Sequence, residues 1–209
     1  MSKRDLLNSA TIGFLIAFFL LAIKYSGNIA VLQLIPYLES TLLLFPALAV
    51  LGTRIAMIFQ RRFRIIFQTA KFLQVGALNT FVDLGVLNIL LSASGITTGI
   101  GFSVFKGFSF LLAVTNSYFW NKHWTFRGRK ALDQDFAEQG KEFAQFLIVS
   151  GIGFLLNVGV ASIVVNFITP QFGLSEKAWP TVGALAGTLI VFTWNFFGYK
   201  LFVFRKQLT

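Results

Sequence analysis

One carboxylate, Asp83, lies deep inside a long apolar stretch of this 209-residue sequence. At a rise of about 1.5 Å per residue, it falls near the middle of the helix predicted over residues 72–93. A charge at the centre of a hydrocarbon layer costs about 2.5 to 3.5 kcal/mol or more unless a partner or water meets it. Lys106 lies at a similar depth in the next apolar stretch, 100–120, so the sequence predicts an ion pair between these two side chains.

Amide side chains accompany Asp83. Asn79 lies four residues earlier, one helical turn away on the same face, and Asn157 falls opposite Asp83 in the internal repeat described below. A stripe of this kind suits contacts with the hydroxyl or phosphate groups of a ligand. The alternative, an ion pair that only fixes the register of two helices, stays open.

A second group of polar side chains belongs to a motif that occurs twice. Residues 121–127 read NKHWTFR and residues 199–205 read YKLFVFR, with matching letters 78 positions apart. Arginine makes planar bidentate contacts with phosphate and lysine supplies a point charge. The side chains that would form such a cradle are Lys122, Arg127, Lys200 and Arg205. The same residue types also suit a belt of aromatic and basic anchors at a membrane interface.

The elements that position these residues are predicted to cross a membrane. Hydrophobic residues make up 56% of the chain and charged residues 12%, about half the charged fraction of a soluble domain. The absence of cysteine and the single histidine exclude disulfides, thiol catalysis and multi-His metal sites. The net charge of +10 comes in short clusters between apolar runs, which favours an all-α integral membrane protein over a nucleic-acid-binding protein.

Six stretches are apolar enough to cross a hydrocarbon layer, which takes about 20 residues. They are 6–25, 41–59, 72–93, 100–120, 143–168 and 180–199. The second is the weakest, because Pro46 and Arg54 lie within it. The first follows two basic residues, as a signal peptide would, but its apolar run is long for one, so we expect a retained helix.

The basic residues predict the orientation. All but three of the 18 Lys and Arg residues fall on one side if six helices alternate, the exceptions being Lys24, Lys106 and Lys177. By the positive-inside rule, both termini and the two basic loops are predicted to be cytoplasmic. Segment 128–142 is too polar to span, and Leu132, Phe136 and Phe143 would share one face of a short helix at the membrane surface.

The last four predicted helices form two related pairs. FLQVGALNTFVDLGV at 72–86 lies over FLIVSGIGFLLNVGV at 146–160. Two helices per unit give both units the same orientation, so the sequence predicts two parallel two-helix repeats, 70–130 and 143–206. Glycines in these helices are expected to let neighbouring helices approach closely; they are Gly76, Gly85, Gly151, Gly153, Gly159, Gly183 and Gly187.

FLQVGALNTFVDLGV, followed one hairpin later by NSYFWNKHWTF, resembles the GtrA-like family of small membrane proteins. The resemblance covers roughly residues 70 to 206, which implies a four-helix domain at 70–209 preceded by two additional helices at 1–69. The family tail commonly has an asparagine and a second asparagine four positions later. Here the second repeat keeps Asn195 and replaces the other with Tyr199, while the first keeps Asn121 and has Asn116 beside the earlier position.

Members of that family are associated with moving polyprenyl-phosphate-linked sugars across the bacterial inner membrane. The resemblance therefore implies a flippase that carries a polyprenyl-phosphate-linked monosaccharide to the outer leaflet for cell-envelope polysaccharide glycosylation. The alternative is a membrane anchor that recruits a cytoplasmic glycosyltransferase through its basic loops. No P-loop, G-x-S-x-G motif or hydrolase-like carboxylate pair is present, so we expect no enzyme activity, metal or cofactor.

The expected substrate-binding residues are Asn79, Asp83, Lys106, Asn116, Asn121, Lys122, Trp124, Arg127, Asn157, Asn195, Lys200 and Arg205. The expected partners are the lipid-linked sugar and membrane phospholipid. A glycosyltransferase partner, a homo-oligomer, the identity of the sugar, the energy coupling and the role of residues 1–69 are left open by the sequence.

Overall fold

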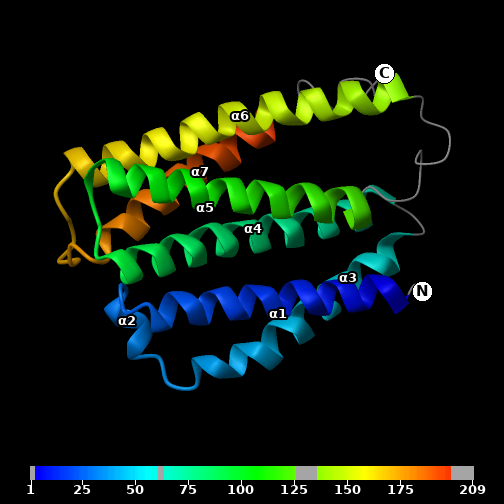
Figure 1. Cartoon of the computed structure of the whole chain (residues 1–209). Helices are drawn as coiled ribbons and strands as arrows, with labels where there is room; N and C mark the ends of the chain where they lie inside the picture. The colour runs from blue at the N-terminus through cyan, green and yellow to red at the C-terminus, as the bar shows by residue number, and fades with distance from the viewer. Residues whose placement is uncertain (1–2, 61–63, 126–135, 199–209) are drawn as a thin grey trace. The chain divides into compact units, whose positions relative to one another are not determined.

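The computed structural model describes residues 3–60, 64–125 and 136–198, and these residues form helices joined by short connections (Figure 1). In chain order the elements are α1 (Lys3–Tyr25), α2 (Ala30–Gln33), the 3-10 helix η1 (Leu38–Ser40), α3 (Thr41–Gln60), α4 (Arg64–Ser94), α5 (Gly99–Trp120), the π-helical turn η2 (Asn121–Thr125), α6 (Phe136–Phe167) and α7 (Trp179–Gly198).

The predicted all-α fold with about six membrane-length helices is confirmed. Among the described residues, five helical stretches are long and apolar enough to cross a membrane: Lys3–Tyr25, Leu38–Phe59, Ile66–Ser94, Gly99–Thr125 and Ile148–Phe167. A sixth, Trp179–Trp194, is apolar but shorter. The second stretch, which the sequence made the weakest of the six, forms a helix although Pro46 lies inside it.

The helices divide into two compact units. The first contains Met1–Ala93 and Leu112–Ala131, and the second contains Ser94–Leu111 and Leu132–Thr209. Helix α5 is therefore shared, its first half belonging to the second unit and its last half to the first. The sequence-based boundary at residue 70 follows a family resemblance and not packing, and it remains a prediction.

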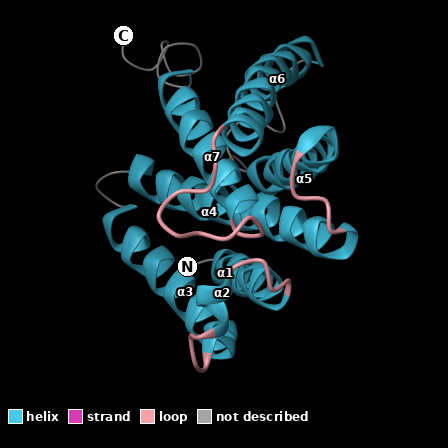
Figure 2. Ribbon diagram, turned by 90° about the vertical axis from the view of Figure 1, so that its left-hand side faces the viewer, coloured by secondary structure: helices cyan, strands magenta, loops and turns pink. Residues whose placement is uncertain are grey.

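In the first unit, α1 packs along α3, and the two helices lie side by side in Figures 1 and 2. Their backbones approach closely at Gly13, where an added Cβ atom would lie 2.4 Å from the carbonyl oxygen of Phe45 and 2.6 Å from the nitrogen of Pro46. No side chain fits in that space, so glycine permits this contact.

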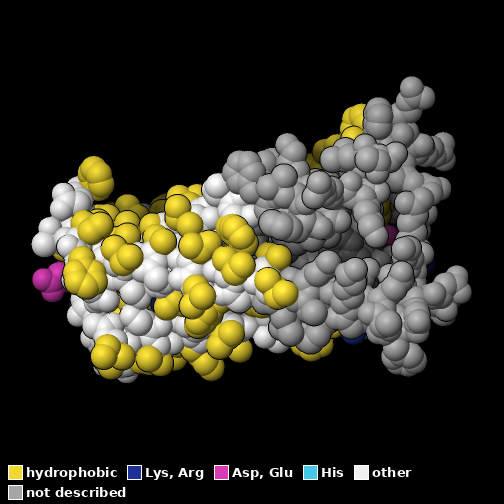
Figure 3. Space-filling model, turned by 90° about the horizontal axis from the view of Figure 1, so that it is seen from above, with side chains coloured by type: hydrophobic (Ala, Val, Ile, Leu, Met, Phe, Trp, Pro, Cys, Tyr) yellow, Lys and Arg dark blue, Asp and Glu magenta, His cyan; other side chains and the backbone are white. Residues whose placement is uncertain are grey.

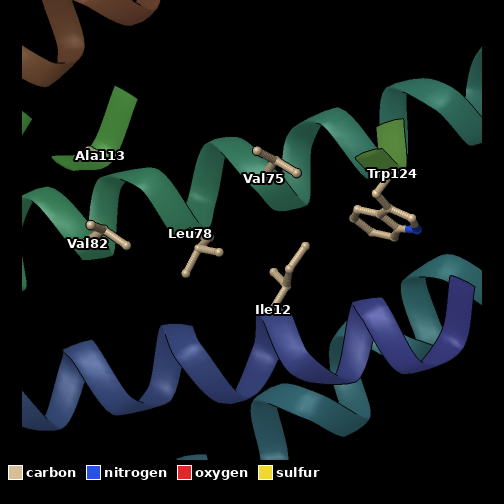
Figure 4. Close-up of a cluster of buried hydrophobic side chains, with 6 residues drawn as sticks. All are labelled: Ile12, Val75, Leu78, Val82, Ala113 and Trp124. Carbon is tan, nitrogen blue, oxygen red and sulfur yellow. The ribbon is translucent and has the colours of Figure 1, made fainter. Parts of the chain in front are cut away.

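The core of the first unit lies between α1 and α4. Ile12 of α1 and Leu78 of α4 are completely buried, and Val75 and Val82 extend the contact along α4. The indole of Trp124 closes one end of this cluster, and its ring lies between the two helices in Figure 4. The N-terminal helix therefore shares a core with the helix that begins the predicted GtrA-like domain.

In the second unit, α6 packs along α7. A Cβ atom added at Gly183 would lie 2.9 Å from the carbonyl oxygen of Ala161, and one at Gly187 would lie 2.5 Å from that of Asn157. The predicted close approach is confirmed at these two glycines, and also at Gly85, where the nearest atom belongs to Phe19 at 2.5 Å.

The same expectation is wrong for three other glycines. A Cβ atom added at Gly76, Gly151 or Gly159 would meet no described atom within 4 Å. At Gly153 it would make ordinary contact, 3.6 Å from a methyl group of Val191. A glycine in an apolar helix thus indicates a close contact only where its side of the helix faces a neighbouring helix.

Large hydrophobic side chains lie exposed along the helices. Examples are Leu155 at 70%, Leu189 at 68% and Phe192 at 65% exposure. Figure 3 shows such side chains spread over the described part of one face. A soluble monomer rarely exposes apolar surface on this scale, whereas lipid chains are a suitable solvent for it.

The polar segment 128–142 is only partly described, because residues 126–135 lie outside the described ranges. Residues 136–142 form the first turns of α6, which continues to Phe167. This half of the segment is therefore part of a long helix, in place of the separate surface helix that the sequence suggested.

Cysteine labelling tests the predicted orientation. The natural chain has no cysteine, so a single cysteine at Thr98 or Gln171, both exposed in helix connections, reports on one loop alone. We expect both variants to react with a membrane-impermeant maleimide added to intact cells, and a Gly128→Cys variant to react only after the cells are opened. Labelling of the Gly128 variant in intact cells would contradict cytoplasmic termini.

Candidate functional site

Two charged side chains are buried inside apolar helices. Asp83 of α4 is 4% exposed and Lys106 of α5 is 0% exposed. Asp83 belongs to the first unit and Lys106 to the second, so the ion pair between them stays a prediction. The depth of both charges in a membrane also stays a prediction, and at such a depth only a partner or a wet path makes a charge tolerable.

The first unit brings two of the predicted amide side chains together. The side-chain nitrogen of Asn116 on α5 donates a hydrogen bond of 2.7 Å to the side-chain oxygen of Asn79 on α4. Asn79 lies one turn before Asp83 on the same helix, so the polar stripe continues from α4 onto α5. The sequence predicted both asparagines as ligand contacts but not their contact with each other.

Asn157 supplies a polar group inside the second unit. This side chain of α6 is 1% exposed, and its amide oxygen accepts no hydrogen bond from the described residues. An unsatisfied buried acceptor typically costs about 1 to 3 kcal/mol. Asn157 therefore offers an acceptor that no described residue uses, at the position of the second repeat that corresponds to Asp83 in the first.

The first basic-aromatic motif begins in a π-helical turn. Helix α5 ends at Trp120, and η2 continues it over Asn121–Thr125. Such turns are rare and occur frequently at functional sites. Within η2, the amide of Asn121 donates to the hydroxyl of Ser117 at 3.1 Å. The ammonium of exposed Lys122 donates to the hydroxyl of Tyr118 at 3.2 Å, and its charge remains accessible.

Trp124 differs from the interfacial-belt interpretation of the motif. It is 3% exposed, and its indole nitrogen donates a hydrogen bond of 3.0 Å to the carboxylate of Asp5 at the start of α1. A belt residue would instead face lipid and water. The turn η2 thus directs Trp124 into the first unit and leaves Lys122 on the surface.

The rest of the predicted cradle cannot be placed. Arg127, Lys200 and Arg205 lie outside the described residues, and for Asn195 only the backbone, in α7, is described. The paired phosphate cradle formed by the two motifs therefore remains a prediction.

The residues that anchor Trp124 were not predicted from the sequence. The ammonium of Lys71 lies 2.6 Å from the same carboxylate oxygen of Asp5. Asp5 is 66 positions away from Lys71 and 119 from Trp124, so no local spacing links them. The one available signal was an acidic residue directly after Lys3 and Arg4, at a helix end predicted to lie at the cytoplasmic surface.

Three further polar contacts were not predicted from the sequence. The hydroxyls of Ser9 and Thr53 lie 2.5 Å apart, and Gln74 donates to Thr53 at 2.8 Å, which joins α1, α3 and α4. Asn28 donates to the side chain of Asn88 at 3.1 Å. These contacts tie residues 1–69 to α4 by hydrogen bonds that hydrophobic periodicity does not reveal.

Comparison with known proteins agrees with this picture. The family described as "GtrA/DPMS, transmembrane domain" matches residues 71–204. The chain is 30% identical over 142 residues to the uncharacterized membrane protein YngA of Bacillus subtilis (strain 168), which covers 66% of this chain and 80% of that protein. No solved structure matches the chain significantly. The chain is a multi-pass membrane protein and belongs to the GtrA/DPMS transmembrane-domain family.

Proposed function

We propose that this protein is a flippase that moves a polyprenyl-phosphate-linked monosaccharide from the cytoplasmic to the outer leaflet of a bacterial inner membrane. The sugar would then serve cell-envelope polysaccharide glycosylation. Membership of the GtrA/DPMS family supports a role in membrane-associated glycosylation. The flippase activity is our proposal for that role.

The observation that carries the proposal is the burial of Asp83 and Lys106 inside membrane-length helices. Charges at such depth mark polar pathways in membrane proteins. Groups that can meet sugar hydroxyls are the hydrogen-bonded amides of Asn79 and Asn116 and the amide oxygen of Asn157, which accepts from no described residue. A protein that only anchors a glycosyltransferase needs basic loops at its surface and has no use for these buried groups.

The proposed protein has no catalytic role. Its substrate enters and leaves chemically unchanged, so no residue is required to act as a nucleophile or general acid. Transport is either passive or coupled to an ion gradient, and flipping down a concentration gradient suffices where an outward-facing transferase consumes the sugar.

Reconstitution tests the proposal directly. The purified protein is placed in liposomes that contain one polyprenyl-phosphate-linked hexose or pentose from a panel, and exposure of the sugar at the opposite leaflet is followed with an impermeant oxidant. We expect translocation of at least one member of the panel at a rate above that of protein-free liposomes. A folded protein that moves none of them, yet retains a glycosyltransferase on the membrane, is instead the anchor.

Neutralising the basic-aromatic motifs should weaken binding of the carrier lipid. A hydrogen bond to a charged group contributes about 1.5 to 3 kcal/mol, so Arg127→Gln or Arg205→Gln is expected to reduce the affinity for polyprenyl phosphate about tenfold or more. Lys177→Gln, in the exposed α6–α7 connection, is the matched control and should bind normally. Normal binding by both arginine variants would reduce the motif to an interfacial belt.

A further inference from the structure

A buried cluster at the start of α1 contains an anion held by two donors. The ammonium of Lys71 at 2.6 Å and the indole nitrogen of Trp124 at 3.0 Å both donate to the same carboxylate oxygen, Oδ1 of Asp5. The side chain of Lys71 is 10% exposed and that of Asp5 is 18% exposed. Two donors that converge on one carboxylate oxygen, one of them an ammonium, make a strong, charge-assisted contact.

Aromatic rings form the walls around the ammonium. The Lys71 nitrogen lies 4.3 Å from the ring centroid of Phe67 and 5.3 Å from that of Trp124. Cation–π contacts of this kind hold the ammonium in place and exclude water from it. The Lys71 ammonium and the Trp124 indole nitrogen are therefore held so that both can donate to one anionic oxygen. Neither donor distinguishes a carboxylate from another oxygen anion, such as a phosphate.

The donors and the acceptor come from different parts of the chain. Lys71 and Trp124 both lie within the family match at residues 71–204, whereas Asp5 lies in the N-terminal addition that precedes it. Trp124 also belongs to the basic-aromatic motif, next to exposed Lys122. The family domain thus supplies an anion site, and the additional helix α1 supplies a carboxylate that fills it.

We propose that Lys71 and Trp124 bind the phosphate of a lipid-linked substrate, and that Asp5 occupies this site as an intramolecular competitor when no lipid is bound. The inference rests on the proposed function for the identity of the lipid. It gives the N-terminal helix a regulatory part, because the phosphate must displace Asp5 before it reaches both donors. The apparent affinity for the lipid is then lower than the intrinsic affinity by the fraction of protein in which the site is open.

The competition predicts that removal of the carboxylate strengthens lipid binding. Asp5→Asn keeps the shape of the side chain and an oxygen that can accept from Trp124, but removes the charge. We expect this variant in phosphatidylcholine nanodiscs to bind polyprenyl phosphate about tenfold more tightly than the natural protein. A change of this size corresponds to the loss of one competing hydrogen bond to a charged group. Lys71→Gln should bind it about tenfold more weakly.

The chain offers a matched control for the loss of a carboxylate beside a buried lysine. Lys24 and Glu39 form an ion pair of 2.9 Å in the same unit, with a lysine side chain that is also 10% exposed. Glu39→Gln removes that carboxylate without touching Lys71 or Trp124, so its affinity for polyprenyl phosphate should equal that of the natural protein. Thermal unfolding of each variant establishes that it is folded.

A readout on the natural sequence keeps the test valid even if Asp5→Asn does not fold. Exchange of a carboxylate for a phosphate changes the hydrogen bond of the Trp124 indole, so its NMR resonance should shift on addition of polyprenyl phosphate. Uncharged polyprenol should cause no shift, and inorganic phosphate separates recognition of a lipid headgroup from recognition of any phosphate. The assignment of the resonance comes from Trp124→Phe.

Each outcome decides the inference separately from the proposed function. Unchanged or weaker binding by Asp5→Asn, or an indole resonance that polyprenyl phosphate does not move, would make Asp5 a structural partner only and would leave the flippase proposal intact. Tighter binding by Asp5→Asn in a protein that moves no lipid-linked sugar would support the anion site and end the flippase proposal.

Discussion

The double variant Asp83→Asn with Lys106→Gln is expected to fold and yet to lose translocation of lipid-linked sugar. The two changes keep the approximate shape and hydrogen-bonding capacity of both buried side chains and remove both charges. A pair that only fixes helix register should tolerate this, since replacement of a buried ion pair by neutral groups is often nearly neutral for stability. A pair that contacts the substrate should not. Thermal unfolding and translocation are measured on the same preparation.

Single variants at these positions carry less information. If the two side chains are paired, Asp83→Asn or Lys106→Gln alone leaves an uncompensated buried charge, which typically costs about 3 to 5 kcal/mol. Either single variant should therefore unfold at markedly lower temperature whatever the role of the pair. The double variant Lys24→Gln with Glu39→Gln removes an ion pair elsewhere in the chain and should still transport. Full transport by the Asp83 and Lys106 double variant would exclude these residues from the mechanism.

Gly187→Ala is expected to separate α6 from α7 and to destabilise the second unit. The added Cβ atom would lie 2.5 Å from the carbonyl oxygen and 3.2 Å from the carbonyl carbon of Asn157. These are backbone atoms, so the helices themselves must move apart. Overpacking of this kind costs about 1 to 3 kcal/mol, a loss of several degrees in Tm for a chain of this length.

Gly159→Ala is the matched control for that change. It adds the same methyl group to α6 at a position where no described atom lies within 4 Å of the new Cβ atom. Because alanine favours the helix over glycine by up to about 1 kcal/mol, this variant should be as stable as the natural protein or slightly more so. Equal melting temperatures for the Gly187 and Gly159 variants would contradict the close contact between α6 and α7.

The sequence was sufficient for the helices because their length follows from one physical constraint. Backbone groups cannot remain unpaired in hydrocarbon, so a run of about 20 apolar residues must become a helix. The predicted stretch 41–59 and α3 (Thr41–Gln60) agree closely, as do 100–120 and α5 (Gly99–Trp120). The burial of Asp83 and Lys106 was predictable for the same reason, since each has enough apolar neighbours on both sides to place it at depth.

The contacts of the site were not predictable, because they depend on which helix faces meet. Gly76 and Gly187 look alike in the sequence, yet only Gly187 faces a neighbouring backbone. Trp124 sits in a motif that an interfacial belt explains equally well, and only the π-helical turn and the packing of α1 bring it into the core. The partners of Asp5, Lys71 and Trp124, are 66 and 119 positions away, so helical periodicity does not predict these contacts.

The contact between Asp5 and its two donors has a consequence for biogenesis. Asp5 is synthesised 66 residues before Lys71 and 119 residues before Trp124. At about 5 to 20 residues per second, roughly 6 to 24 seconds pass before the indole exists. Lys71 is available earlier, but the second donor to the carboxylate of Asp5 exists only once η2 has been synthesised. The surroundings of Asp5, in the first turn of α1, are therefore completed late in synthesis, by a residue of the turn η2 that follows α5.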